Sequence, residues 1–206
     1  MSTINHNLLT SENLHEPKGV DTADIDKVYI SDGAGSGSWL RYTTMGWEDY
    51  QHAGADQTGL ASGVPTVVAN DGAGVYSNTV GALPGSTGIW DTATSSFDFA
   101  AGNCKLGDTI DLRVDLTYTV STNNDNMKLE LKLAVGDPAE FSVTIDERNI
   151  DTAGSQSVMR FISFYIGSNA VLNNPGQITI TPDSAGDDIS VNGWYIRTIP
   201  LVPVAT

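Results

Sequence analysis

Hydrophobic and polar residues alternate without a break over two neighbouring stretches in the middle of the chain. In the first stretch every second residue from Ile110 to Val120 is apolar, and the residues between them are charged or polar. The same period of two returns from Met127 to Val135. Such alternation is typical of β-strands that bury one face. The two stretches therefore predict a long β-hairpin whose wide apolar face needs a second sheet or a partner subunit to cover it.

Charge selects a register for this hairpin, because opposite charges stabilise facing positions of antiparallel strands and like charges destabilise them. Pairing Val120 with Met127 places Asp115 opposite Lys132. A shift of one strand by two residues would instead set like charges against each other. We therefore expect the first register, with the two Asn residues at 123–124 forming the turn, since Asn tolerates left-handed backbone geometry.

The rest of the C-terminal region reads as short strands separated by Gly, Asn, Asp and Pro, and no segment longer than a turn or two shows helical periodicity. This predicts an all-β fold, a jelly-roll β-sandwich of about eight to ten strands with an extended N-terminal arm. The expected strands are 64–69, 74–79, 89–92, 96–99, the central hairpin, 140–146, 157–167, 177–181 and 189–200.

One of these strands, residues 158–166 with the sequence VMRFISFYI, is apolar on both faces. A strand of this kind is expected in the centre of a sheet or at a subunit contact. We expect a homotrimer, because this strand and the hairpin offer more apolar surface than one small sandwich covers. The candidate oligomer contacts are Phe161, Phe164 and Tyr165.

The N-terminal region differs in composition from the rest of the chain. Residues 1–19 contain few apolar residues, which predicts an arm that is ordered only when it lies on a partner. The sequence Asp-Gly-Ala-Gly occurs at 32–35 and again at 71–74, and each copy predicts a strand, a glycine turn and a strand. We expect two parts, an arm with a glycine-rich joint at 1–45 and the jelly roll at 46–206. The joint residues are Asp32, Gly33, Gly35, Gly37 and Trp39.

Composition excludes several classes of partner. The chain has 10 Lys and Arg against 25 Asp and Glu, a formal net charge of −15, which disfavours contact with nucleic acid. The start lacks a basic segment followed by an apolar run, and no apolar stretch approaches membrane length, so we expect neither an export signal nor a membrane partner. The single cysteine, Cys104, excludes an intrachain disulfide.

No pattern in the sequence predicts a catalytic site. Cys104 would need a base to act as a nucleophile, and outside the arm His52 is the only histidine, so a small buried or semi-exposed cysteine is expected rather than a nucleophile. The carboxylate pairs at 108/111, 146/147 and 187/188 are expected in solvated turns or on solvent-facing sides of strands, where nothing raises a pKa. The glycine spacing of residues 33–38 does not fit a dinucleotide-binding loop. We therefore expect no enzymatic activity.

Ligand sites are equally weak in the sequence. The oxygen-rich segments 123–126 and 183–188 resemble calcium loops in composition but not in spacing, so we expect no metal and no cofactor, with a stabilising Ca²⁺ as the alternative. The aromatic residues Trp90, Trp194 and Tyr195 could form a platform for sugar stacking, but aromatic residues within the strands of a sandwich are usually core.

Two parts of the sequence resemble structural proteins of tailed-phage virions, of the capsid decoration (cement) or head-fibre kind. The first is similar to a short N-terminal module that precedes unrelated domains in such proteins, and it comprises HEPKG at 15–19 and VYISDGAGSGSW at 28–39. The second resembles a phage jelly-roll domain and runs from IWD at 89–91 through LGDT at 106–109 to NGWYI at 192–196.

The resemblance implies a non-enzymatic virion protein that is assembled in the host cytoplasm, binds the major capsid protein on the outer capsid surface, and stabilises the shell. It also implies a trimeric domain that is attached through its N-terminal region. The capsid-binding residues would then lie in the arm, at His15, Glu16, Pro17, Lys18 and Gly19. The alternative function is a head-fibre or tail-associated module that binds host glycans through Trp and Tyr side chains.

Overall fold

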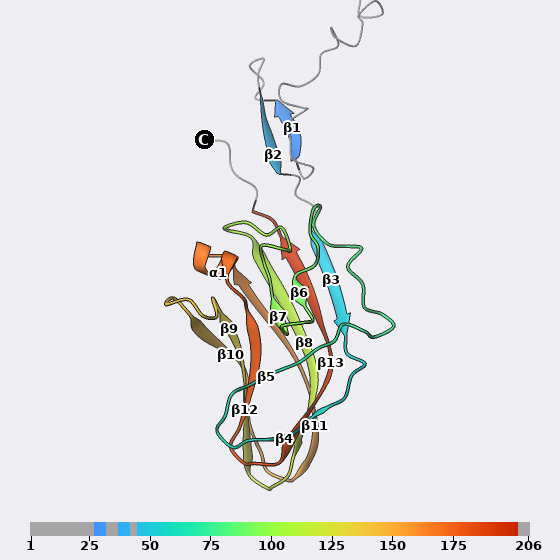
Figure 1. Ribbon diagram of the computed structural model, residues 1–206, viewed down its shortest axis with the longest axis vertical. Helices are drawn as coiled ribbons and strands as arrows, with labels where there is room; N and C mark the ends of the chain where they lie inside the picture. Colours follow the sequence, from blue (N-terminus) through green and yellow to red (C-terminus); the bar gives the residue numbers. More distant parts are fainter. Residues whose placement is uncertain (1–26, 32–36, 42–44, 202–206) are drawn as a thin grey trace, which may run out of the picture. The chain divides into compact units, whose positions relative to one another are not determined.

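The computed structural model describes residues 27–31, 37–41 and 45–201 (Figure 1). The chain separates into two compact units, one of which contains a small N-terminal hairpin, while the other is the unit Thr43–Leu201. The hairpin consists of β1 (Lys27–Ser31) and β2 (Gly37–Arg41), which pair antiparallel with Tyr29 opposite Trp39. The two strands predicted around the first Asp-Gly-Ala-Gly sequence are therefore confirmed.

The larger unit is an all-β sandwich of the jelly-roll kind, as predicted, with two antiparallel sheets facing each other across one core (Figure 1). The five-stranded sheet has the order β11-β8-β13-β3, and β4 also pairs with β13; the four-stranded sheet has the order β10-β9-β12-β5. The first sheet contains β3 (Gly46–Gln51), β4 (Gln57–Leu60), β8 (Thr109–Val120), β11 (Gly154–Tyr165) and β13 (Asp187–Ile199). The second contains β5 (Thr66–Val67), β9 (Asp125–Leu133), β10 (Phe141–Ile150) and β12 (Gln177–Pro182).

Two small elements complete the unit. β6 (Trp90–Asp91) and β7 (Ser96–Phe97) form a short ribbon of their own. The helix α1 (Asn169–Asn173) makes little more than one turn, and the side chain of Ser168 caps it by accepting a hydrogen bond from the backbone of Val171.

The predicted central hairpin is wrong, because β8 and β9 lie in opposite sheets. β8 pairs with β11 and β13, whereas β9 pairs with β10 and β12. Both strands bury alternate residues, as predicted. Alternation shows which face of a strand is buried but not which strand lies beside it, and two strands that face each other across a core satisfy the same pattern. The turn residue Asn124 does adopt the expected left-handed conformation, with φ of 55°.

The core between the sheets is built from these alternating side chains and closed by aromatic residues. Trp194 from β13 and Tyr118 from β8 are among the largest completely buried side chains. Trp90 packs edge-on against Phe97 at 4.8 Å and against Trp194 at 5.8 Å between ring centroids. The short β6–β7 ribbon thus places its aromatic residues on the core side of the sandwich.

Other segments depart from the sequence-based expectation. Only Thr66–Val67 of the expected strand 64–69 is a strand, and residues 74–79 run as a loop. β3 and β4 were not predicted. β11 was expected in the centre of a sheet or at a subunit contact because both its faces are apolar; within the described residues it is an edge strand, so the central position is wrong and the subunit contact stays a prediction.

Candidate interaction surfaces

The edge strand β11 presents large apolar side chains to solvent. Within the described chain it pairs with β8 on one side only. Met159 is 57% exposed, and Phe161 and Tyr165 are each 68% exposed. The alternate residues, among them Val158 and Phe164, point toward the core. Because large exposed apolar groups of this kind mark interaction sites, we call Met159, Phe161 and Tyr165 the β11 patch.

The β11 patch continues onto the outer face of the sheet as a mixed polar and aromatic surface. Phe161 lies opposite Arg113 of β8, which in turn lies opposite Tyr195 of β13. The guanidinium of Arg113 sits 5.7 Å from the centre of the Tyr195 ring, within the range of a cation–π contact. Its Nε also lies 2.9 Å from Asp115 Oδ2, in an ion pair not aligned as a hydrogen bond. The guanidinium of Arg113 is therefore held on this face by Tyr195 and Asp115.

A second ion pair lies on the same face and borders a shallow depression. Arg197 Nε donates to Asp111 Oδ2 at 2.9 Å, and the Asp111 carboxylate holds the pKa of Arg197 above its usual value. The pKa of Asp111 is lowered in spite of its partial burial, because Ser163 and Arg197 bind its charged form. These groups line the depression together with Phe161, Ile162 and Tyr195. Its apolar wall and charged rim suit a protein contact better than a small ligand.

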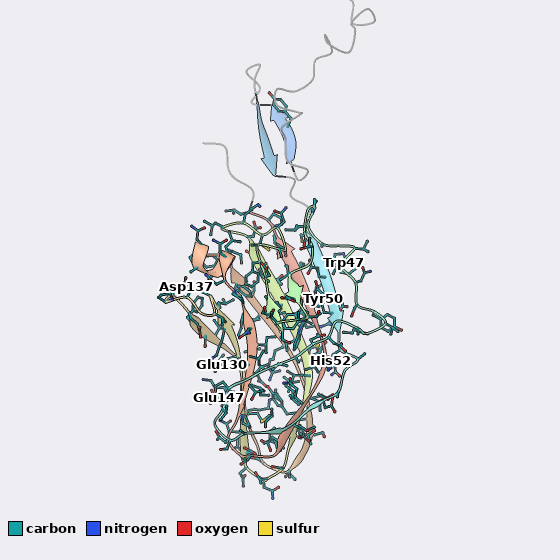
Figure 2. The ribbon with its side chains drawn as sticks, viewed as in Figure 1. Trp47, Tyr50, His52, Glu130, Asp137 and Glu147 are labelled. Carbon is teal, nitrogen blue, oxygen red and sulfur yellow. The ribbon has the colours of Figure 1, made fainter. Side chains whose placement is uncertain are left out.

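β3 forms the opposite edge of the same sheet. Residues 72–82 form a loop that is hydrogen-bonded to β3, here called the 72–82 loop. The loop is bound to the β3 backbone at two points, by a bridge between Asp49 and Asn78 and by a 2.7 Å hydrogen bond from Trp47 N to Gly81 O. Gly81 packs against the Trp47 ring so closely that a Cβ there would lie 2.2 Å from it. Figure 2 shows Trp47 on β3, near this loop.

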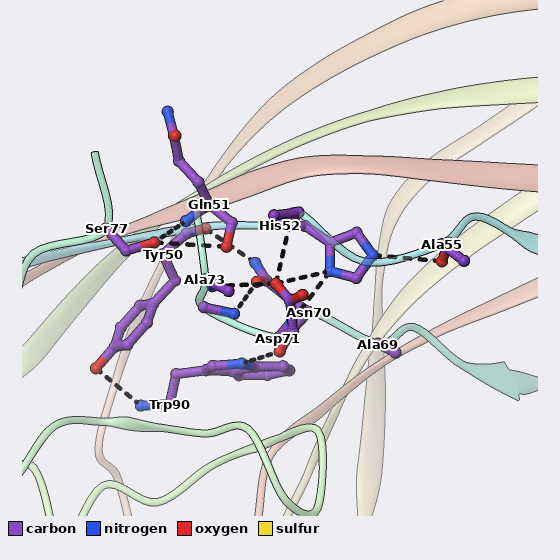
Figure 3. A network of polar contacts seen from close by, with 12 residues as sticks. Tyr50, Gln51, His52, Ala55, Ala69, Asn70, Asp71, Ala73, Ser77 and Trp90 are labelled. Carbon is purple, nitrogen blue, oxygen red and sulfur yellow. Dashed lines mark hydrogen bonds and ion pairs between the residues drawn. The ribbon is translucent and has the colours of Figure 1, made fainter. Parts of the chain in front are cut away.

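A network of buried and half-buried polar groups fixes the base of the loop (Figure 3). Asn70 Nδ2 donates to Tyr50 O at 2.9 Å, and Trp90 Nε1 donates to Asn70 O at 2.8 Å. The backbone N–H of Asp71 donates to His52 Nδ1 at 3.0 Å. Hydrogen bonds to Tyr50 of β3, to the neighbouring His52 and from the core residue Trp90 thus hold the segment that leads into the loop.

Within this fixed loop three apolar side chains face solvent. Val75 and Val80 are each 90% exposed and Tyr76 is 73% exposed. The backbone between them is held by turns, with Ser77 N donating to Gly74 O at 3.0 Å and Ala82 N to Thr79 O at 2.9 Å. A held loop that exposes apolar residues is pre-organised for a partner, since little conformational entropy is lost on binding. We call Val75, Tyr76 and Val80 the loop patch.

Charge differs between the two edges of the sheet. No Lys or Arg occurs between Arg41 and Lys105, the part of the sequence that includes β3 and the 72–82 loop. The same part contains acidic residues at Glu48, Asp49, Asp56, Asp71, Asp91 and Asp98. Arg113 of β8 lies opposite Phe161 of β11, and Arg197 of β13 lines the same depression as Phe161 while lying opposite Trp47 of β3. The segment that carries the loop patch is therefore acidic, whereas the surface beside the β11 patch contains arginine.

The structure places the predicted oligomer contacts differently from one another. Phe161 and Tyr165 lie in the β11 patch. Phe164 points inward and packs against Phe99 at 5.8 Å between ring centroids. Sequence reasoning missed the loop patch, because residues 74–79 have the pattern of a strand. The absence of Lys and Arg from residues 42–104 is the signal that could have marked this segment.

The predicted capsid-binding arm lies outside the described residues, and so do three residues of the predicted joint. These are His15, Glu16, Pro17, Lys18 and Gly19 of the arm, and Asp32, Gly33 and Gly35 of the joint. The other two joint residues, Gly37 and Trp39, lie in β2. The attachment role of the arm and the role of the joint stay predictions.

The candidate catalytic and sugar-binding residues are structural. Cys104 is buried in the core, as expected, and His52 is engaged with Asp71 at the base of the 72–82 loop. Trp90 and Trp194 are buried in the core and cannot stack on a sugar. Tyr195 is half-buried beneath Arg113.

The expectation that the paired carboxylates are solvated is wrong for one member of each pair. Asp108 is buried and accepts hydrogen bonds from the backbone of Lys105 and Leu201, each at 2.9 Å. Asp146 is buried between Arg148 and Arg160. Asp187 is completely buried, and this burial raises its pKa. In each case backbone or arginine donors compensate a carboxylate at a strand end or sheet edge, which no period of two reveals.

The two oxygen-rich segments lie together in the fold, which their sequences did not predict. Asp183 N donates to Asn126 O at 2.9 Å, and Ser184 N donates to Asp125 Oδ1 at 3.2 Å. Across the described ranges, no group of three or more His, Cys, Asp or Glu side chains is arranged to hold a metal ion. The same ranges contain no helix with the length and hydropathy to cross a membrane.

The chain is similar to known proteins in structure and not in sequence. No protein-family model and no curated protein sequence matches it. Among solved structures it is similar to a chain of the T13 IBDV viral particle, with 8% identity over 83% of this chain and 35% of that chain and a TM-score of 0.43. It is also similar to PRD1 vertex protein P5, with 16% identity, 77% and 98% coverage and a TM-score of 0.35.

A third similar structure is a Clostridium thermocellum xylanase 10B, covering CBM22-1-GH10 modules, with 18% identity, 50% and 19% coverage and a TM-score of 0.33. The chain spans about a third of the length of the first of these three, 35% of that chain. At such identities and TM-scores the likenesses assign no partner and no activity to this chain.

Proposed function

We propose that this protein is a non-enzymatic structural component of a virion, a decoration protein that binds the outer surface of an assembled capsid and stabilises the shell. One observation carries the proposal: β1 and β2, which contain the described residues of the stretch 28–39 that resembles a virion attachment module, belong to a different compact unit from the sandwich. A separate attachment segment and a compact acidic domain are what a protein needs in order to bind a shell and project into solvent.

The chemistry of stabilisation follows from mass action. A protein that binds the assembled shell and not its dissociated subunits stabilises the shell by RT times the logarithm of its concentration over its Kd, about 1.4 kcal/mol for each tenfold excess. The partner in this proposal is the major capsid protein. His15, Glu16 and Lys18 supply polar contacts, Pro17 limits the entropy lost when the arm becomes ordered, and Gly19 allows the chain to turn away from the shell.

The proposal includes a homotrimer, which adds affinity without adding contacts. Three arms on one trimer bind neighbouring sites at high effective concentration, so the trimer remains bound when one arm dissociates. Support for self-association comes from the exposed β11 patch. Large apolar side chains such as Met159, Phe161 and Tyr165 are rarely grouped on the surface of a monomer, and such groups mark interaction sites. The glycan-binding alternative is weaker, because two of its three aromatic candidates, Trp90 and Trp194, are buried in the core.

The experiment compares the full chain with a chain that begins at Gly46, each added to capsids that lack the protein and then sedimented. We expect the full chain to sediment with capsids and the shortened chain to stay in the supernatant, with circular dichroism showing that both are folded. A full-length variant with Ala at His15, Glu16 and Lys18 should lose binding at least tenfold.

A full-length Val64→Asp variant serves as the matched control, because Val64 is exposed and belongs to the sandwich and not to the arm sequence. It should bind capsids as the natural chain does. If the folded chain from Gly46 still decorates capsids as tightly as the full chain, the arm is not the anchor. A glycan screen with the full chain would favour the alternative function if it returned a specific sugar.

A further inference from the structure

We infer that the β11 patch of one copy packs against the loop patch of the next copy, so that identical chains join head to tail in a closed ring. The inference rests on the homotrimer of the proposed function and names the two surfaces that build it. Both surfaces belong to the sandwich, and neither includes the arm.

The β11 edge lacks the devices by which exposed edge strands usually avoid association. Natural edges carry Lys or Pro, a bulge, or a covering segment. β11 has the sequence GSQSVMRFISFY and contains neither Lys nor Pro. It pairs with β8 over all twelve residues without a bulge. Its one charged residue, Arg160, is turned toward Asp146 of β10, with Nε donating to Oδ1 at 2.9 Å. An exposed edge strand of this length and composition is expected to be covered by a partner.

The loop patch is the complementary surface because it is apolar, projecting and held. Val75 and Val80 are the most exposed large apolar residues of the described chain. Gln51 fixes the loop between them, with its backbone N donating to Ser77 Oγ at 2.8 Å and its side-chain oxygen accepting from Tyr76 N at 3.3 Å. A projecting loop of small and aromatic side chains suits the depression beside Phe161.

Opposite edges of one sheet cannot meet within one copy. β8 and β13 lie between β11 and β3, so the two edge strands are about 14 Å apart at ordinary strand spacing. A contact between the two edges therefore joins different copies, and it is heterologous, leaving one free surface at each end of the assembly until a ring closes. Three copies, the number in the proposed homotrimer, would close such a ring.

Charge favours this pairing over contact between like edges. Copies with a net charge of −15 repel one another. Within residues 42–104, which include β3 and the 72–82 loop, every Asp, Glu, Lys or Arg side chain is acidic, so two loop patches in contact would bring like charges together. The face beside the β11 patch offers Arg113 and Arg197, and the side chain of Arg197 is 44% exposed. An acidic flank on an arginine-bearing face reduces the repulsion that a symmetric contact would increase.

The test uses two full-length variants that each break one surface, Phe161→Asp and Val80→Asp, with the mass measured by light scattering after size exclusion. Both side chains are mostly exposed, so both variants should fold. We expect the natural chain to have the mass of three copies and each variant the mass of one. The exposed Val64→Asp variant, outside both patches, should keep the mass of three copies.

Mixing the two variants gives the decisive result. Phe161→Asp retains an intact loop patch and Val80→Asp retains an intact β11 patch, so an equimolar mixture can form one contact and no second. We expect a species of two chains, one of each variant, and nothing larger. A mixture that stays monomeric overturns the inference, and so does a Val80→Asp variant of unchanged mass. A monomeric or two-fold dimeric natural chain also overturns it, while capsid binding by the arm is tested separately.

Discussion

The carboxyl groups of Asp125 and Asp187 lie within hydrogen-bonding reach of each other, and both side chains are almost completely buried. Ser121 donates to Asp187 Oδ1 from its backbone N at 2.8 Å and from its Oγ at 2.9 Å. Asp187 Oδ2 accepts no hydrogen bond from any described donor. Burial raises the pKa of Asp187, Ser121 opposes that effect, and the neighbouring Asp125 adds to it. Two adjacent buried carboxylates of this kind hold one shared proton more readily than two charges.

The raised pKa of Asp187 predicts that the contribution of this group to stability falls as pH rises. Because the pKa of Asp187 is higher in the folded chain than in the unfolded one, its contribution is complete below the unfolded pKa, about 3.9, and is lost as pH rises through the folded pKa. In the pH range where the folded chain binds one proton more than the unfolded chain, each rise of one pH unit lowers the contribution of Asp187 to the free energy of unfolding by about 1.4 kcal/mol. Asp187→Asn replaces the proton by an amide that can donate to Asp125. We expect this variant to be more stable than the natural chain at pH 7.5 and no more stable at pH 4.

Denaturant unfolding at both pH values checks this prediction. Asp183→Asn is the matched control, because Asp183 is exposed in the same connection and the same change of carboxyl to amide there leaves the buried pair intact. An Asp187→Asn variant that is less stable than the natural chain at both pH values would show that both carboxylates are ionised and separately compensated.

β8 and β9 show which features of a strand follow from its own sequence and which do not. A period of two identifies a strand and its buried face, and both were correct because water is excluded from one side of each strand. The neighbour of a strand is set by the path of the whole chain. The charge argument that paired Asp115 with Lys132 assumed adjacency, whereas these residues lie in different sheets.

β3 escaped prediction because its inward positions include an acid. Glu48 is buried, and its carboxylate accepts from Tyr50 Oη and from Ile89 N, each at 2.7 Å. The partner Ile89 is far along the chain, so no local pattern could show that this charge is compensated. The β11 patch was half predicted, since the sequence showed a strand with two apolar faces but not that its outer face stays uncovered.

The Glu48 site leads to a prediction on folding. Tyr50→Phe removes the hydroxyl that donates to Glu48 and leaves a buried carboxylate with one donor fewer. We expect the free energy of unfolding to fall by about 1 to 3 kcal/mol. Tyr76→Phe removes a hydroxyl of the same type from a side chain that is mostly exposed, and should cost less than about 0.5 kcal/mol. Equal losses in urea unfolding would mean that the Glu48 carboxylate finds a replacement donor, such as water.

A third prediction concerns the ion network that joins the edges of the two sheets. Asp146 of β10 accepts from Arg148 Nε at 2.7 Å and from Arg160 Nε of β11 at 2.9 Å. Asp146→Asn leaves two partly buried arginines without their counter-charge, and we expect a loss of about 1 to 3 kcal/mol. Asp111→Asn breaks one half-exposed pair with Arg197 and should cost less than about 1 kcal/mol. Similar losses for the two variants, measured at one protein concentration, would mean that the Asp146 network is as weak as a surface ion pair.

The last prediction separates folding from association on one strand. Phe164 and Phe161 are three residues apart on β11 and point to opposite sides of the sheet, Phe164 onto Phe99 and Phe161 into solvent. Phe164→Ala leaves a cavity in the core and should lower the free energy of unfolding by about 2 to 4 kcal/mol, somewhat below the range for a completely buried ring. Phe161→Ala should change the unfolding of an isolated chain by less than about 0.5 kcal/mol.

Association should show the reverse order, because only Phe161 lies in the proposed contact. We expect Phe161→Ala to shift the equilibrium toward single chains on dilution, and Phe164→Ala to keep the natural mass for as long as it is folded. Unfolding is measured at several protein concentrations, since the stability of an oligomer depends on concentration and that of a monomer does not. If Phe161→Ala lowers stability equally at every concentration and leaves the mass unchanged, Phe161 supports the fold of its own chain and the β11 patch is not an interface.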